Sequence, residues 1–331
     1  MTNERSVFYE LVRCATLAAS SHNTQCWKFK LADRQISILP DLTRRCPAVD
    51  PDDHHLYASL GCATENLLIA AKAHGFEGTV ELQQAGDAVK AIHIHLTAGE
   101  PVHSLLFEAI VERQSARSIY DGQPLKAEVL KRLDSAGTGE GVSLILLTEQ
   151  QALEAVLGYI TEANTAQIND PAFIKELKSW IRFNPSEAAK KGDGLFSKSA
   201  GNPAAPHWLG SWLFDLTFGA KSENKKIAKQ IRSSAGIAIF VSDKNDPAHW
   251  IAAGRCYQRF ALQAEALNIR TAFLNQPVEV VALRPQFANY LGIGNRRPDL
   301  IVRFGHGPKM PRSHRRPVEA VVAKTLKPSL L

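Results

Sequence analysis

Two short polar stretches hold most of the side chains that could do chemistry. Residues 19–27 read Ala-Ser-Ser-His-Asn-Thr-Gln-Cys-Trp, and residues 113–117 read Arg-Gln-Ser-Ala-Arg. The second stretch offers guanidinium and hydroxyl groups directly after an expected helix. Such groups give charge-assisted and neutral hydrogen bonds to phosphate or polyol oxygens. We therefore expect Arg113 and Ser115 to bind an anionic, polar ligand.

A second candidate anion site lies near the C-terminal end of the sequence. Arg315 and Arg316 are consecutive within a strongly basic region. A pair of guanidinium forks suits a phosphate, whereas the alternative interpretation is a solvated basic tail. The region lacks interleaved aromatic residues and any zinc-finger pattern, so we expect no nucleic-acid partner.

Composition sets the class of protein. The chain has 331 residues, of which 45% are hydrophobic and 22% charged, a balance typical of soluble globular proteins. Its five cysteines are scattered without a C-x-x-C pair, which predicts a reducing compartment. There is no signal-peptide pattern and no apolar stretch long enough to span a bilayer, so we expect a cytoplasmic protein with no membrane partner. His54-His55 and the pair His93 and His95 are interpreted as structural, and no metal is expected.

Apolar spacing predicts alternating helices and strands. The expected helices cover 5–18, the low 50s to His74, 101–112, 125–134, 150–183, 247–267 and 278–291; the expected strands cover 27–31, 35–39, 78–83, 90–96, 142–148, 237–242, 270–274 and 299–304. The stretch 184–224 interrupts this pattern with glycines, prolines and the aromatic residues Trp208, Trp212, Phe214 and Phe218. We interpret it as a lid whose aromatic side chains fold onto an apolar surface, or else as a plain surface insertion.

One helical segment occurs twice. Residues 60–76 align without gaps on residues 253–269, with Gly61 matching Gly254, and Gly75 and Asn268 both expected to stop a helix in the left-handed conformation. Small residues on one face of both copies suit a helix buried against its duplicate. The sequence therefore predicts a duplicated chain.

These motifs together carry a family resemblance. The stretch Leu17-Ala18-Ala19-Ser20-Ser21-His22-Asn23-Thr24-Gln25-Cys26-Trp27-Lys28-Phe29 resembles the A-P-S-x-x-N-x-Q-P-W motif of the nitroreductase family of FMN proteins, and Arg113-Gln114-Ser115-Ala116-Arg117 resembles that family's R-x-S-x-R motif. The repeated helix is similar to the family's dimer-interface helix. Each motif occurs once, in an order opposite to that of ordinary members. This arrangement resembles the fused, twin-domain branch that includes the mycobacterial Acg-type proteins.

The resemblance implies an α+β, nitroreductase-like fold in which two pseudo-symmetric halves of one chain mimic the family homodimer. We expect the first half over 1–103 and the second over 104–331, the latter with the lid-like insertion at about 184–224. A monomer is then expected. Because each motif occurs once, we expect one FMN per chain.

The resemblance also assigns the cofactor contacts. Arg113, Ser115 and Arg117 would hold the phosphate, the ribityl chain and the pyrimidine edge; Ser20, Asn23 and Gln25 would come from the other half; Asn275 and Gln276 would lie against the ring; Arg315 and Arg316 would close on the phosphate. Cys26 and Ala19 stand in place of the two motif prolines, which loosens the turn. Trp27 is interpreted as a core residue.

Two functions follow from that site. The first is an FMN oxidoreductase that passes hydride from NAD(P)H through flavin N5 to a nitroaromatic, a quinone or a similar electron-poor acceptor, with no catalytic side chain required. The alternative is a flavin-sequestering protein with a closed lid and little NAD(P)H-dependent activity. A binding module without flavin is the third option.

Overall fold

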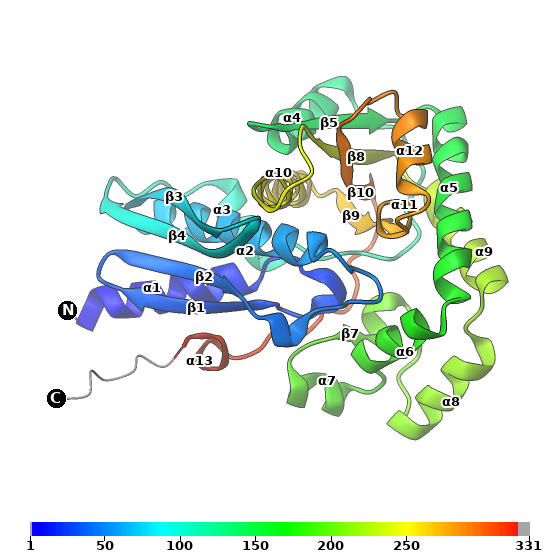
Figure 1. The fold of residues 1–331 in the computed structure, drawn as a ribbon, viewed down its shortest axis with the longest axis horizontal. Helices are drawn as coiled ribbons and strands as arrows, with labels where there is room; N and C mark the ends of the chain where they lie inside the picture. Colours follow the sequence, from blue (N-terminus) through cyan, green and yellow to red (C-terminus); the bar gives the residue numbers. More distant parts are fainter. Residues whose placement is uncertain (1, 324–331) are drawn as a thin grey trace.

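The computed structural model describes residues 2–323, and these residues form two four-stranded antiparallel sheets with helices between and around them (Figure 1). The first sheet has the order β1-β2-β4-β3 and the second β5-β8-β10-β9. Their strands are β1 (Trp27–Ala32), β2 (Gln35–Pro40), β3 (Phe76–Ala85), β4 (Ala88–Ala98), β5 (Val142–Leu147), β8 (Gly236–Ser242), β9 (Arg270–Phe273) and β10 (Arg297–Gly305). The predicted α+β class is confirmed.

The two sheets follow one plan along the chain. A helix precedes the first strand of each sheet, namely α1 (Thr2–Thr16) and α4 (Ala127–Gly137), and a long helix joins the second strand to the third, namely α2 (His54–Ala73) and α10 (Pro247–Ala266). In both sheets the strands lie in the order first, second, fourth, third. This shared plan supports the predicted duplication. The pseudo-symmetry of the halves and their boundary after residue 103 stay predictions.

Helices α2 and α10 pack on each other at the centre of the molecule. Almost every residue of α2 is buried, because α1, α10 and the first sheet surround it. Both helices end as the sequence predicts, with Gly75 at φ 77° and Asn268 at φ 58° directly after them. One continuous hydrophobic core contains residues of both sheets and both helices, Trp27 among them.

The second sheet is buried on both faces. All seven residues of β8 are buried, which explains its unbroken apolar sequence Ile-Ala-Ile-Phe-Val. Helix α10 packs on one face, and a second core lies on the other face. Helices α5 (Gln150–Ile168), α9 (Ala220–Arg232) and α12 (Arg284–Tyr290) contribute to that second core.

Three helix predictions need correction. The region 150–183 is broken after α5, because Asp170 caps a new helix, α6 (Pro171–Trp180), whose proline sits in its first turn. The region 278–291 likewise divides into α11 (Gln276–Glu279) and α12. Helix α3 (Leu105–Glu112) begins after Ser104, whose hydroxyl accepts a hydrogen bond from the Phe107 amide.

The insertion is larger than predicted. Strands β1 and β2 are joined by a tight turn, whereas the matching strands β5 and β8 are separated by residues 148–235. This excursion contains α5, α6, α9, the short parallel pair β6 (Ile181–Arg182) and β7 (Leu195–Phe196), α7 (Pro185–Lys191) and α8 (His207–Thr217). The expectation that its aromatic residues fold inward is wrong for Trp208 and Trp212, which are exposed on α8.

Residues 318–323, at the C-terminal end of the described structure, pack beside the first sheet. Helix α13 (Val318–Val321) lies beside α1 and β1, and the Ala323 amide donates a hydrogen bond to the Phe29 carbonyl at 2.7 Å. The segment that carries Arg315 and Arg316 is thereby held between the second sheet and the first. None of the described helices is both long and apolar enough to cross a membrane.

Candidate functional site

Arg113 and Arg315 meet at the C-terminal end of α1. Nη2 of Arg113 donates a hydrogen bond to the Leu17 carbonyl at 3.2 Å, and Nη2 of Arg315 reaches the same oxygen at 3.4 Å. Nε of Arg315 also donates to the Thr16 carbonyl at 2.9 Å. The carbonyls at a helix C-terminus carry partial negative charge, so they attract both guanidinium groups. The structure thus brings together two residues that are far apart in the sequence.

These two cations are not neutralised by protein carboxylates. Within residues 2–323, neither Arg113 nor Arg315 has a carboxylate oxygen within 4.0 Å. Burial, with a further contribution from the charge of Arg113, lowers the pKa of Arg315 to about 9. Two adjacent cations, of which Arg113 is buried and Arg315 half-buried, favour a bound anion, because an anion would offset both their desolvation and their mutual repulsion.

Several buried polar atoms around Arg113 have no hydrogen-bond partner in the described part of the chain. They are Nε and Nη1 of Arg113, Oγ of Ser115 and Oη of Tyr257. Tyr257 comes from α10, and burial raises its pKa to about 12 even though the charge of Arg113 acts in the other direction. Buried polar groups are normally paired, so this cluster is suited to a ligand with phosphate or hydroxyl oxygens. Tyr257 was missed in the sequence, where nothing distinguishes it from a core aromatic residue.

The second sheet fixes the loop that carries Ser115 and Arg117. The Ala116 amide donates to the Thr271 carbonyl of β9 at 2.8 Å, and the amide group of Gln230 donates to the Arg117 carbonyl at 2.6 Å. Nη2 of Arg303 donates to the Ser118 carbonyl at 2.7 Å. The backbone is therefore rigid, while the Arg117 side chain remains exposed and makes no hydrogen bond to the described residues.

The turn that carries Ser20, Asn23 and Gln25 is strained. His22, Asn23 and Gln25 have φ values of 47°, 54° and 53°, a left-handed conformation that residues other than glycine rarely adopt. The Ser20 hydroxyl accepts a hydrogen bond from the backbone amide of Gln25 at 3.1 Å. This bond helps to hold the turn closed. Strain of this kind persists where the surroundings over-determine the backbone, and it concentrates at functional sites.

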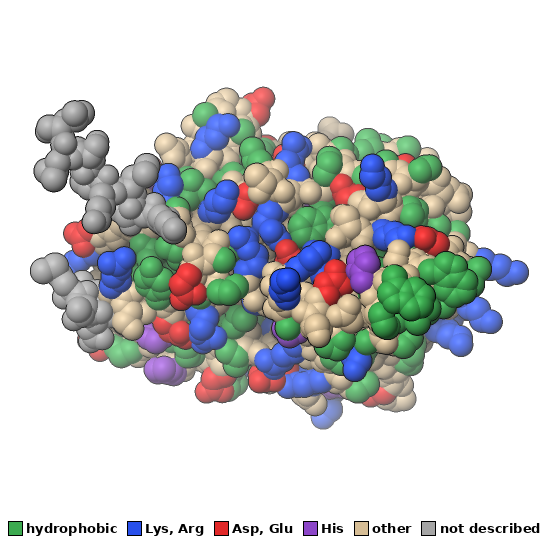
Figure 2. All heavy atoms as spheres, turned by 90° about the horizontal axis from the view of Figure 1, so that it is seen from below, with side chains coloured by type: hydrophobic (Ala, Val, Ile, Leu, Met, Phe, Trp, Pro, Cys, Tyr) green, Lys and Arg blue, Asp and Glu red, His purple; other side chains and the backbone are tan. Residues whose placement is uncertain are grey.

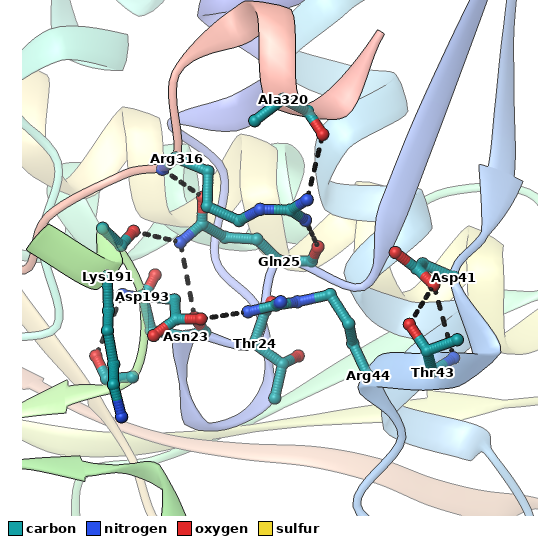
Figure 3. Close-up of polar contacts among 12 residues, drawn as sticks. Asn23, Thr24, Gln25, Asp41, Thr43, Arg44, Lys191, Asp193, Arg316 and Ala320 are labelled. Atoms are coloured by element: carbon teal, nitrogen blue, oxygen red, sulfur yellow. Dashed lines mark hydrogen bonds and ion pairs between the residues drawn. The ribbon is translucent and has the colours of Figure 1, made fainter. Parts of the chain in front are cut away.

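The side-chain amides of Asn23 and Gln25 bind protein carbonyls. Nδ2 of Asn23 donates to the carbonyls of Gly194 and His314 at 3.0 and 3.1 Å. Nε2 of Gln25 donates to the Gly192 carbonyl at 2.8 Å, and its Oε1 accepts from the Arg316 amide at 2.9 Å (Figure 3). These amides therefore join the turn to the insertion and to the C-terminal segment. Contact between these side chains and FMN stays a prediction.

Residues 192–194 hold the insertion against the turn that carries Asn23 and Gln25. We call these three residues the clamp. Asp193 is buried and forms ion pairs with Arg182, at 2.7 Å, and with Arg44. Gly192 and Gly194 have φ values of 65° and 76°, and a Cβ at Gly192 would approach the Arg315 carbonyl oxygen to 2.8 Å. Only glycine fits both the backbone conformation and the available space.

The two C-terminal arginines separate. Arg315 lies with Arg113, whereas the guanidinium group of Arg316 donates to the Ala320 carbonyl at 3.0 Å beside the Gln25 turn (Figure 3). The prediction that both close on one phosphate therefore has structural support only for Arg315. The side chain of Asn275 also bonds to the protein, because its Oδ1 accepts a hydrogen bond from the Ile301 backbone amide at 2.9 Å. Oε1 of the neighbouring Gln276, in contrast, is buried and has no hydrogen-bond partner among the described residues.

Two histidines also lie near the site: His55 is buried on α2, and half-buried His22 belongs to the turn that carries Asn23 and Gln25. Nε2 of His55 is 3.5 Å from a carboxylate oxygen of Glu279, in helix α11, which begins at Gln276. Burial, together with the positive charge of Arg117, lowers the pKa of His22 to about 4. No group of three or more potential metal ligands occurs within residues 2–323. His93 instead bonds to Ser37 inside the first sheet.

No family model matches the chain. It is 23% identical over 320 residues to the protein named "Putative NAD(P)H nitroreductase Rv3131" of Mycobacterium tuberculosis, a match that covers 93% of this chain and 88% of that protein. It is also 23% identical over 330 residues to "Putative NAD(P)H nitroreductase acg" of the same organism, with 95% of each covered. The chain is homologous to these mycobacterial proteins. The resemblance predicted from its motifs is confirmed.

Two solved nitroreductase structures have a limited likeness to this chain. A Bacteroides fragilis nitroreductase with bound FMN has a TM-score of 0.40 and 15% identity, and the match covers 69% of this chain and 98% of that one. The FMN-dependent nitroreductase NfnB of Mycobacterium smegmatis, solved in complex with NADPH, has a TM-score of 0.41 and 12% identity, with 63% and 94% covered.

Proposed function

We propose that this protein binds one FMN and passes reducing equivalents from NAD(P)H to an electron-poor acceptor such as a nitroaromatic or a quinone. The observation that carries this proposal is the unneutralised pair of buried Arg113 and half-buried Arg315 beside the unpartnered atoms of Ser115 and Tyr257. The names of the homologues, NAD(P)H nitroreductases, support the reaction class. We also propose a cytoplasmic, monomeric protein.

Each residue has a defined part in the proposal. Arg113 and Arg315 would neutralise the phosphate, while the hydroxyls of Ser115 and Tyr257 would bind ribityl oxygens. The exposed Arg117 side chain would stabilise negative charge at the pyrimidine edge. When bound, FMN would supply the redox chemistry, so the protein needs only to bind, orient and shield it.

A second candidate function is flavin sequestration. The clamp favours it, because Asn23, Gln25 and Asp193 hold the insertion against the turn that resembles a flavin-binding motif. A rigidly held insertion would restrict access of the nicotinamide. In this case the same site would bind FMN but accept hydride slowly.

Two measurements separate these functions. Release of FMN from the denatured protein, at one equivalent per chain, is expected for both, and a ratio of two would contradict a single site. Anaerobic mixing with NADPH or NADH then decides: rapid loss of the flavin absorbance supports the oxidoreductase, whereas loss only with dithionite supports sequestration. Arg113→Ala should lose the flavin, and full retention would refute the assigned site.

A further inference from the structure

Helix α8 exposes a continuous apolar stripe. Trp208, Trp212 and Leu216 are 73%, 58% and 67% exposed, and their spacing of four residues places them on one face of the helix. Figure 2 shows hydrophobic side chains gathered over this part of the molecule. Large aromatic side chains seldom remain so exposed without a partner. The stripe, defined as these three residues, therefore needs an occupant.

The fold holds the stripe outward. On the opposite side of α8, Gly210 packs so closely on Phe183 that a Cβ would approach its ring to 2.6 Å. Asp215 forms an ion pair with Lys178 of α6 at 2.6 Å. The helix is thus anchored by one side, and the orientation of the stripe is a property of the folded protein.

The chain segment that contains the stripe is basic. Residues 184–232 contain eight Lys or Arg against four Asp or Glu, a net +4 out of the +6 of the whole chain. Three of these acidic residues, Glu187, Asp193 and Asp215, are already in ion pairs. In the helix that follows α8, Lys225, Lys226 and Lys229 line a hollow of about 280 Å³ with Ser222 and Ile119. None of these three lysines has a carboxylate within 4.0 Å in the described part of the chain.

We propose that α8 and the lysines of α9 dock this protein on an anionic membrane surface. Tryptophan is enriched at the boundary between lipid headgroups and acyl chains, and a face of Trp and Leu beside lysines is the signature of a helix that lies in that boundary. Lysines are depleted in protein–protein interfaces, so their concentration here favours lipid over a protein partner. The sequence suggested no membrane partner only because it lacks a spanning segment, which surface binding does not require.

Co-sedimentation of the full chain with vesicles tests this proposal. Binding is expected to vesicles that contain phosphatidylglycerol, to be weak with pure phosphatidylcholine, and to fall as salt is raised. The triple variant W208S/W212S/L216S and the double variant K225E/K229E should each weaken binding roughly tenfold or more. The variant V102S/L105S, which alters two exposed apolar residues outside the stripe, is the matched control and should bind like the wild type.

Other outcomes overturn the proposal. If the wild type does not bind anionic vesicles, or if the triple variant binds as well as the control, the stripe is not a membrane contact. If light scattering shows a dimer that the triple variant abolishes, with no vesicle binding, the occupant is a second copy of this chain. Circular dichroism of each variant verifies folding. The test needs no bound flavin, so it is independent of the proposed function.

Discussion

Gly61 of α2 and Gly254 of α10 make reciprocal contacts where the two helices cross. A Cβ at Gly61 would overlap the Ile251 carbonyl oxygen, and a Cβ at Gly254 would overlap the Ala58 carbonyl oxygen. When the repeat alignment is carried two residues further back, Ala58 corresponds to Ile251, so the two contacts are equivalent. A local two-fold relation between the helices would produce this pair of contacts. The crossing therefore supports the predicted duplication and explains why both repeats keep glycine at this position.

The variant Gly61→Ala tests the closeness of this crossing. The added methyl group cannot rotate away from a backbone carbonyl, so α2 and α10 must move apart within a densely packed core. Such overpacking lowers the free energy of unfolding by about 2–3 kcal/mol. Urea denaturation of the variant measures this loss.

Gly158→Ala is the matched control for that experiment. Gly158 lies inside helix α5, where an added Cβ would have no neighbour within 4 Å in the described structure. Removing glycine from a helix interior should raise the free energy of unfolding by about 0.5–1 kcal/mol. Equal effects of the two substitutions would show that the helix crossing is less close than described.

Arg315→Ala should separate ligand binding from folding. If Arg315 neutralises the FMN phosphate, the variant loses about 2–3 kcal/mol of FMN affinity. The flavin-free protein should change by less than about 1 kcal/mol in unfolding free energy, because lost bonds to the carbonyls of α1 are offset by relief of repulsion from Arg113. Titration calorimetry with FMN and urea denaturation measure the two quantities.

Arg312→Ala controls for the loss of one positive charge nearby. Arg312 is exposed and pairs with Glu112 at 2.7 Å, away from the carbonyls that hold Arg315. Exposed ion pairs contribute little to the free energy of unfolding, so the stability of the variant should stay close to that of the wild type. Its FMN affinity should also stay close to the wild-type value. Equal loss of FMN affinity in the two variants would indicate general electrostatic attraction rather than a phosphate contact.

Local patterns in the sequence predicted much of the fold but not the partners of its polar side chains. Gly75 and Asn268 stop their helices as predicted, because that signal lies within a few residues. The carbonyls that Asn23 and Gln25 bind belong to Gly194 and Gly192, more than 160 residues away, and no periodicity encodes that contact. The outward orientation of Trp208 likewise depends on how α8 is anchored, which the amphipathic pattern alone does not reveal.

Gln25→Glu should release the clamp. The substitution keeps an acceptor for the Arg316 amide but places a carboxylate against the Gly192 carbonyl, where the wild type donates a hydrogen bond at 2.8 Å. The substitution removes the donor and leaves two buried acceptor oxygens facing each other. This should lower the free energy of unfolding by about 1–3 kcal/mol. Hydrogen exchange at the Gly194 amide, which donates to the Asn23 carbonyl at 3.1 Å, should accelerate.

The same variant discriminates between the two proposed functions. If the clamp restricts nicotinamide access, Gln25→Glu should increase the rate at which NADPH reduces the bound flavin. Gln84→Glu, at an exposed position of β3, makes the same chemical change and should alter neither exchange nor reduction. Unchanged protection of residues 192–194 in Gln25→Glu would show that this hydrogen bond does not hold the insertion.

Asp50 should make stability depend on pH. Its carboxylate accepts hydrogen bonds from the amides of His55 and Leu56 at 2.9 Å, at the start of α2. Burial nevertheless raises the pKa of Asp50 to about 7, with further contributions from the negative charges of Asp52 and Asp53. Below this pH the folded protein keeps a proton on Asp50 that the unfolded chain releases at about pH 4.

The sign of the effect follows from this difference in proton binding. Between about pH 4 and pH 7 the folded state binds more protons at Asp50, so its contribution to the free energy of unfolding falls as pH rises and is lost above about pH 7. His22 acts in the opposite direction, because burial lowers its pKa from 6.5 to about 4. Subtracting the unfolding free energy of Asp50→Asn from that of the wild type at each pH removes the His22 contribution. The difference should decline from pH 4 to pH 7 and then level off, whereas a flat or rising difference would mean that Asp50 is charged in the folded protein.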